Sequence, residues 1–259
     1  MLTRRHLLHV GLVTGCTMCA AFAIDRRSTA GAADAVTPSR ISGLGYDLSF
    51  VGSQRQTIMT GDRAAHLDLP TLKGRSHLYG IGPIQGLTGE VTIADSRPSL
   101  ARVSDDHLIR VTESYEVGVP FFVWAEVSTW QTQELPDDVR TYAELERFVG
   151  EAGSRAGLTQ AFPFMVTGRP ELIDFHIVSA TPDTPPGLEG HQKIQIPFEL
   201  HGQEVTFVGF WSSRHQGVFT PMGTNMHVHF QSLDNKVSGH VQGLKLAQGM
   251  KLGLPKGDE

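Results

Sequence analysis

Asn225-Met226-His227-Val228-His229-Phe230 alternates apolar residues with histidines. A period of two is typical of a β-strand, so His227 and His229 are expected on one face and the apolar residues on the other. The turn residues Asp234-Asn235 follow shortly afterwards and predict a two-residue hairpin loop. With that loop, the register pairs His229 with His240, which places three imidazoles on one face of a sheet.

Three imidazoles at this spacing predict a metal site. Directly opposed strand residues have Cβ atoms roughly 5 Å apart, and a zinc ion with bonds of about 2 Å to nitrogen can draw such side chains together. The alternative for His227 and His229 alone is two surface histidines, and the third histidine, His240, favours the metal site. Three neutral nitrogens leave a tetrahedral zinc ion one open position, which is the pattern of catalytic zinc.

The composition limits the kinds of partner that the protein can bind and the residue types that can bind a metal. The 259 residues carry a net charge of −5, and no run of Lys or Arg forms a stripe for a phosphate backbone, so no nucleic acid is expected. The expected partner is a small molecule. Both cysteines, Cys16 and Cys19, lie near the amino end. A transition metal in the rest of the chain must therefore rest on His and carboxylate ligands.

The amino end predicts export. Arg4-Arg5, followed by a weakly apolar run through Ile24, resembles a twin-arginine signal, which we place at residues 1–33. The exported protein is expected in the periplasm or outside the cell, with no membrane contact beyond the signal. Two alternatives are a membrane anchor and, from Val13-Thr14-Gly15-Cys16, a lipoprotein. Residues 34–45 are small and polar and predict a flexible tether.

The remaining residues, 46–259, predict an α+β domain of mostly antiparallel sheet. One helix is expected, with Thr141 as its N-cap, Glu144 at the capping-box position and an end near Gly153 or Gly157. The Pro-rich stretch 181–190 predicts a loop and a lobe boundary. The expected strands are 46–51, 77–81, 89–94, 107–111, 121–127, 162–167, 172–178, 194–200, 204–211, 225–233 and 236–246.

The histidine segment resembles the zinc site of the α-acetolactate decarboxylase family. The resemblance rests on residues 223–230 and on Ser238-Gly239-His240-Val241, with intervals of two and eleven residues between the ligands. Upstream, Gly86-Leu87-Thr88-Gly89-Glu90 is similar to the family's catalytic glutamate segment. Two further stretches, Val166-Thr167-Gly168 and residues 206–210, resemble core strands of the family.

This resemblance implies a fold and a reaction. The family is two-lobed and rich in sheet, and it converts (S)-2-acetolactate to (R)-acetoin and carbon dioxide with zinc. Loss of carbon dioxide beside a carbonyl leaves an enolate-type anion, which needs positive charge nearby and then a proton. The resemblance implies that Glu90 delivers or positions that proton. It is also compatible with a homodimer.

The sequence departs from the family at the positions where the family binds its substrate. His176 stands where the family has an arginine for the substrate carboxylate, and Pro83 stands where it has a threonine. The family's C-terminal tail, with a further glutamate, has no counterpart in the printed sequence. His176 is a candidate carboxylate contact or a strand histidine without a role, and Arg214 and His215 are candidates for the missing positive charge. The alternative function is an exported zinc-binding protein with another substrate or no catalysis.

Overall fold

The computed structural model describes residues 36–257. The signal predicted over residues 1–33, with Cys16 and Cys19, lies outside this range. No helix within residues 36–257 is long and apolar enough to cross a membrane.

The first half of the described chain forms a seven-stranded antiparallel sheet in the order β1-β2-β9-β4-β5-β6-β7. Each strand pairs with a neighbour that lies near it in sequence, except that β9 inserts between β2 and β4. The strands are β1 (Ser39–Gly43), β2 (Tyr46–Val51), β4 (Leu78–Pro83), β5 (Glu90–Ala94), β6 (Arg97–Val103), β7 (Ile109–Thr112) and β9 (Phe122–Glu126).

The second half forms an eight-stranded antiparallel sheet in the order β10-β17-β11-β14-β15-β16-β12-β13. A small third sheet pairs β3 (Leu67–Asp68) with β8 (Gly118–Val119). The strands of the large sheet are β10 (Trp130–Glu134), β11 (Phe162–Gly168), β12 (Leu172–Val178), β13 (Gln195–His201), β14 (Val205–Trp211), β15 (Met226–Ser232), β16 (Ser238–Lys245) and β17 (Lys251–Pro255).

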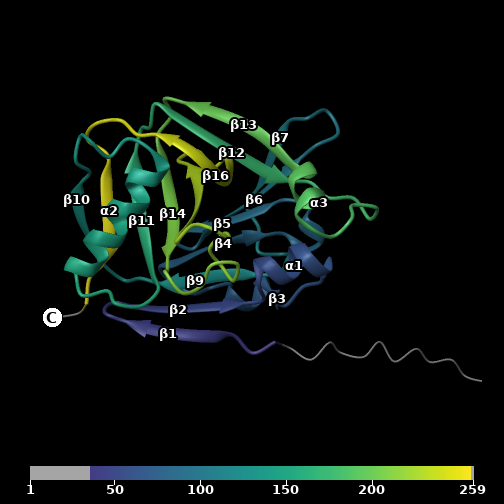
Figure 1. Ribbon diagram of the computed structural model, residues 1–259, viewed down its shortest axis with the longest axis horizontal. Coiled ribbons are helices and arrows are strands. Elements are labelled where there is room, and N and C mark those ends of the chain that lie inside the picture. The colour runs from purple at the N-terminus through teal and green to yellow at the C-terminus, as the bar shows by residue number, and fades with distance from the viewer. Residues whose placement is uncertain (1–35, 258–259) are drawn as a thin grey trace, which may run out of the picture. The chain divides into compact units, whose positions relative to one another are not determined.

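The longest helix, α2 (Tyr142–Arg155), covers the outer face of the second sheet (Figure 1). Thr141 and Glu144 form the predicted capping box. Gly150 and Gly153 let the helix approach closely, because a Cβ there would lie 2.9 Å from Trp211 and 2.3 Å from Phe162. The short helices are α1 (Gln54–Thr60), α3 (Leu188–Lys193), η1 (Leu69–Leu72) and η2 (Gln85–Leu87).

The two large sheets face each other, with β5 against β15 and β16 and with β6 against β12. Residues of both sheets share one buried apolar cluster, for example Ile81 and Val123 of the first sheet with Phe207 of the second. The side chains of β5 point alternately to the two faces of the first sheet. Val91 and Ile93 join a second apolar cluster on the far face of the first sheet, so Glu90 and Thr92 face the second sheet. That face is where the predicted site lies.

The structure confirms the α+β class and the predominance of antiparallel sheet, and it corrects two boundaries. Within the tether predicted at 34–45, Ser39–Gly43 form β1 and pair with β2, because the next strand supplies an edge for them. The stretch 181–190 is a loop only as far as Gly187, because helix α3 begins at Leu188. It is not a boundary between sheets, since it lies between β12 and its neighbour β13. The change of sheet falls between β9 and β10 instead.

Candidate metal centre

The hairpin of β15 and β16 has the predicted register, with His229 directly opposite His240. Ser232 holds the turn, because its Oγ accepts hydrogen bonds from the backbone N–H groups of Val237 and Lys236, at 3.0 and 3.1 Å. Asn235 takes the left-handed conformation, with φ of 56°. The loop is longer than the two residues predicted, because the backbone N–H of Ser232 donates to the carbonyl of Val237 and that of Asn235 donates to the carbonyl of Ser232. The sequence pattern therefore predicted the backbone that brings the histidines together.

The three imidazoles converge on one point. His227 Nε2 lies 3.2 Å from His229 Nε2 and 3.0 Å from His240 Nδ1, and one nitrogen of each ring lies within 4.8 Å of the others. Nitrogens bound to one tetrahedral zinc ion are separated by about 3.3 Å, given bonds of about 2.0–2.1 Å. The site therefore fits a transition metal of zinc's size.

Backbone carbonyls fix which ring nitrogens face the centre. His227 Nδ1 donates to the carbonyl of Phe219 at 2.7 Å, and His229 Nδ1 donates to the carbonyl of Val91 at 3.0 Å. A proton on Nδ1 leaves the lone pair of Nε2 for a metal, and such outer contacts are typical of metal-binding histidines. His227 and His229 are buried and His240 is half-buried, so the group is not a solvent-exposed pair.

Burial also sets the protonation of the ligands. It lowers the pKa of His227 to about 4, and it holds the pKa values of His229 and His240 well below 6.5. All three are therefore neutral at neutral pH. Neutral imidazole is the form that binds a metal.

Glu90 faces the histidines from the other sheet. It is 3 % exposed, and its Oε2 lies 3.8 Å from His229 Nε2. Its Oε1 accepts a hydrogen bond from the N–H of Val178 at 3.3 Å. Burial raises the pKa of Glu90 well above 4.5, which favours the protonated carboxylic acid. Gly89 precedes it at φ of 155°, where a Cβ would lie 2.4 Å from the carbonyl of Ala101.

His176 lies beside the same centre. It pairs with His240 across β12 and β16, and the two ring centroids are 4.5 Å apart. Its Nε2 lies 4.0 Å from Glu90 Oε1. Burial lowers the pKa of His176 to about 3, so at neutral pH it offers hydrogen bonds and not a positive charge. Pro83, at the family's threonine position, pairs with Glu90 across β4 and β5.

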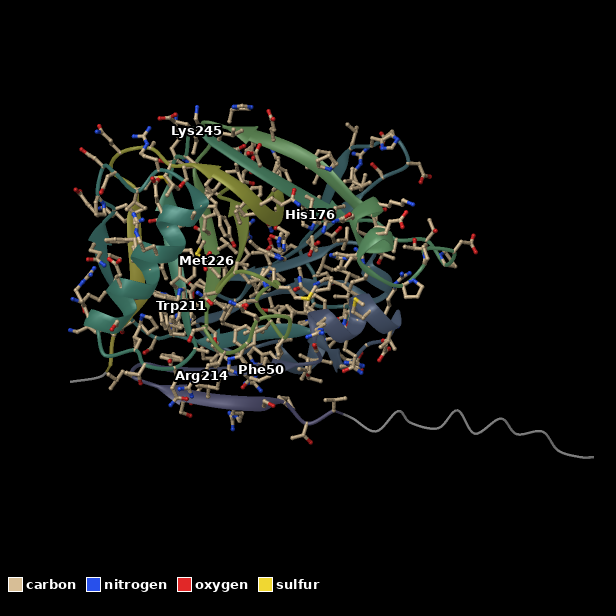
Figure 2. All side chains as sticks on the ribbon, viewed as in Figure 1. Phe50, His176, Trp211, Arg214, Met226 and Lys245 are labelled. Carbon is tan, nitrogen blue, oxygen red and sulfur yellow. The ribbon has the colours of Figure 1, made fainter. Side chains whose placement is uncertain are left out.

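A cavity of about 290 Å³ opens beside these groups, and Glu90, His176 and His240 line it. Its other polar lining residues, none of which the sequence pattern singles out, are Gln54, His191, Gln192, Gln195 and Gln242. They come from α1, α3, β13 and β16, and no local pattern relates them. Arg214 and His215 line a different cavity of about 320 Å³, near Phe50 and apart from His176 (Figure 2).

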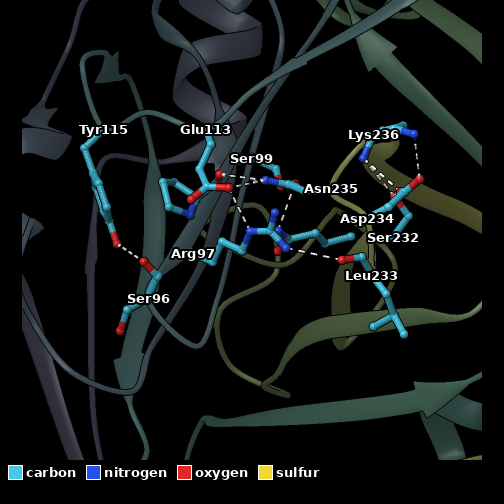
Figure 3. A network of polar contacts seen from close by, with 12 residues as sticks. Ser96, Arg97, Ser99, Glu113, Tyr115, Ser232, Leu233, Asp234, Asn235 and Lys236 are labelled. Carbon is cyan, nitrogen blue, oxygen red and sulfur yellow. Dashed lines mark hydrogen bonds and ion pairs between the residues drawn. The ribbon is translucent and has the colours of Figure 1, made fainter.

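A polar network fixes the tip of the hairpin against the first sheet (Figure 3). Asn235 accepts a hydrogen bond from Ser99 on β6 and from Gln231 Nε2 at 2.9 Å. Its Nδ2 donates to Glu113 Oε2 at 3.2 Å. Arg97 Nη1 donates to the carbonyl of Leu233 at 3.2 Å. The network joins the sheet that carries Glu90 to the hairpin that carries the histidines.

Comparison with known proteins identifies a family. A family profile described as alpha-acetolactate decarboxylase matches residues 50–256. Among solved structures, a protein of unknown function from Staphylococcus aureus, described as similar to alpha-acetolactate decarboxylase, has a TM-score of 0.66 at 16 % identity, with 80 % of this chain and 84 % of that chain covered. The alpha-acetolactate decarboxylase of Bacillus subtilis has a TM-score of 0.62 at 18 % identity, with the same coverage of each chain. Among curated sequences, none shows significant similarity.

Proposed function

Because the chain belongs to the alpha-acetolactate decarboxylase family, we propose that it is a zinc-dependent carboxy-lyase. Its substrate is (S)-2-acetolactate or a related 2-hydroxy-3-keto acid, and its products from acetolactate are (R)-acetoin and carbon dioxide. One observation carries the proposal. A buried carboxyl group, Glu90, lies 3.8 Å from the Nε2 of His229 in a three-histidine site and lines the adjoining cavity.

The ligands and the proton donor have separate tasks. His227, His229 and His240 would hold the zinc ion, which supplies positive charge where the enolate-type anion forms as carbon dioxide leaves. Glu90, kept protonated by burial, donates its proton to the carbon that has lost carbon dioxide. Loss of carbon dioxide from a carboxylate consumes one proton, so Glu90 regains a proton from water before the next turnover.

One hydrogen bond holds Glu90 in place for this transfer. The N–H of Val178 binds Oε1 and leaves Oε2 on the side of His229. His176 lies on the Oε1 side and lines the cavity. We propose that His176, as a neutral imidazole, hydrogen-bonds the substrate in place of the family's arginine.

The test is an assay of acetoin formation. Zinc-loaded protein is incubated with racemic acetolactate, and acetoin is measured against the spontaneous rate. We expect consumption of half the racemate, and loss of the reaction after zinc is removed with a chelator. His229→Ala should abolish both zinc binding and acetoin formation, whereas His201→Ala, at an exposed histidine of β13, should change neither.

The alternative is a zinc-binding protein with another substrate or no catalysis. It is favoured by the cavity wall, because no Lys or Arg is among the described residues that line the cavity. Stoichiometric zinc without acetoin above the spontaneous rate would support this alternative. We also propose that residues 1–33 export the protein, which fractionation of the native host would test.

A further inference from the structure

The cavity beside the metal centre has an inner end and a mouth, which differ in burial. Glu90 and His176 line the cavity and are 3 % and 4 % exposed. Leu188 and Met222 line the same cavity, and they are 50 % and 42 % exposed. The groups next to the three-histidine site therefore lie at the inner end, and two large apolar side chains lie at the mouth.

Apolar side chains also line the buried part of the cavity. Ile58, Leu87 and Phe121 contribute to the lining, and all three are buried. Leu87 has a φ of 55°, a conformation that a branched side chain rarely adopts and that costs free energy. Its strained backbone places an apolar side chain in the same cavity as Glu90. Apolar surface is therefore present both at the mouth and below it.

Backbone hydrogen bonds to α1 fix the segments that carry the two exposed side chains. The N–H of Gly187 donates to the carbonyl of Ile58 at 2.7 Å, which holds the start of α3, with Leu188, against α1. The helices α1 and α3 lie side by side (Figure 1). The carbonyl of Gly217 accepts a hydrogen bond from α1, also at 2.7 Å. A Cβ on Gly217 would lie 3.3 Å from Cγ of Met222, so Met222 lies close to this junction.

The exposed apolar surface at the mouth is continuous with the lining of the cavity. Other exposed leucines, such as Leu44 and Leu108, do not line it. The cavity volume of about 290 Å³ is close to the lower end, about 300 Å³, for cavities that bind ligands of drug size. A small acid such as acetolactate therefore leaves part of it to water. The hydrophobic effect favours an alkyl chain that displaces this water and covers the mouth.

We propose that the cavity selects 2-hydroxy-3-keto acids with an unbranched alkyl acyl chain longer than acetyl, and that Leu188 and Met222 are specificity-determining residues for that chain. The proposal rests on the decarboxylase function proposed above and names its substrate class. The reacting end lies near Glu90, and the chain extends to the mouth. Gln192 and Gln242 also line the cavity but are exposed, so water satisfies them beside a bound alkyl chain.

The experiment compares three racemic 2-hydroxy-2-methyl-3-keto acids, whose acyl groups are acetyl, butanoyl and hexanoyl. Release of carbon dioxide by zinc-loaded protein, corrected for the spontaneous rate, gives kcat/KM for each compound. Each added methylene should raise kcat/KM by about two- to fourfold, mainly through a lower KM, because it leaves water for apolar surface. The hexanoyl compound should therefore exceed acetolactate by about tenfold or more.

Variants at the mouth assign the preference to its apolar side chains. Leu188→Ser and Met222→Ser should each lower the ratio of kcat/KM for the hexanoyl compound to that for acetolactate by about threefold. Met222→Leu keeps an apolar side chain and should preserve the ratio. Leu108→Ser, at an exposed leucine outside the cavity, is the matched control and should keep the wild-type ratio. Zinc content and far-UV circular dichroism establish that each variant is folded.

The outcomes separate this inference from the proposed function. If kcat/KM stays constant or falls as the acyl chain lengthens, or if the Leu188→Ser, Met222→Ser double variant keeps the wild-type ratio, the inference is wrong and the decarboxylase function stands. If zinc is bound and none of the three compounds releases carbon dioxide above its spontaneous rate, the proposed function itself is wrong and the inference falls with it.

Discussion

Ser99 Oγ on β6 donates a hydrogen bond to Asn235 Oδ1 in the turn between β15 and β16. The two residues belong to different sheets, and both are buried. This bond therefore joins the sheets at the tip of the hairpin that carries His229 and His240.

Replacement of Asn235 tests the junction. Asn235→Ala removes the partner of Ser99 and Gln231 and leaves buried polar groups unpaired, so it should lower the free energy of unfolding by about 1–3 kcal/mol. Urea denaturation of the metal-free protein measures the loss. Lys236→Ala, at the exposed neighbour in the same turn, should stay within about 0.5 kcal/mol of wild type. Equal effects of the two substitutions would contradict a special role for Asn235.

Replacement of a ligand tests the metal site. His229→Ala should reduce bound zinc from about one ion per chain to nearly none after dialysis, because three ligands are the minimum for a catalytic zinc site. Elemental analysis gives the ratio. His77→Ala, at an exposed histidine paired with Asp95, serves as the control. Equal zinc in wild type and His229→Ala would show that the ion binds elsewhere.

Replacement of Glu90 tests its role in proton transfer separately from zinc binding. Glu90→Gln keeps the shape and hydrogen-bonding ability of the side chain but removes the transferable proton. We expect kcat to fall by about 100-fold or more, while bound zinc and KM change little. Glu204→Gln, at an exposed glutamate, should leave kcat unchanged. A kcat near the wild-type value in Glu90→Gln would assign the proton to another donor.

The raised pKa of Glu90 also predicts a pH dependence of stability. Below pH 4.5 the carboxyl group is protonated in both folded and unfolded chains. As pH rises further, the unfolded chain releases this proton first, so the folded state of the metal-free protein loses stability until pH passes the folded pKa. Glu90→Gln cannot lose stability in this way. Its unfolding free energy relative to wild type should therefore be higher at pH 8 than at pH 4.5.

The lowered pKa of His227 predicts the opposite pH dependence, in which the stability of the metal-free protein rises with pH. Its folded pKa is about 4, whereas the ordinary value is 6.5. Between these values the unfolded chain binds more protons, so metal-free protein should lose stability as pH falls from 6.5 towards 4. His227→Gln should flatten this slope in urea titrations of the metal-free protein, and His201→Ala should not. An unchanged slope in His227→Gln would contradict the burial of a neutral imidazole at this position.

The three-histidine group could be predicted because its arrangement is local. A period of two put His227 and His229 on one face, and the turn chemistry of Asp234-Asn235 set the register with His240. Glu90 was different. Nothing in its neighbourhood marks it as facing the histidines, and only the family resemblance singled it out. Its position depends on how two sheets pack, which no local pattern encodes.

The polar cavity residues on α3 and β13 and the order of the strands were missed for the same reason. His191 lies on a six-residue helix after a Pro-rich loop, and nothing in that stretch indicates a neighbour on β16. Strand β17 inserts between β10 and β11, although its residues follow β11 by some eighty positions. Pairings this distant in sequence are set by the assembled core, where the apolar strands compete for partners.

All three ligands lie within residues 227–240, so a bound ion closes only a short loop of chain. Closing a short loop removes little conformational freedom from an unfolded polypeptide. The unfolded chain therefore retains some affinity for the ion, and the ion stabilises the native state by less than its tight binding alone implies.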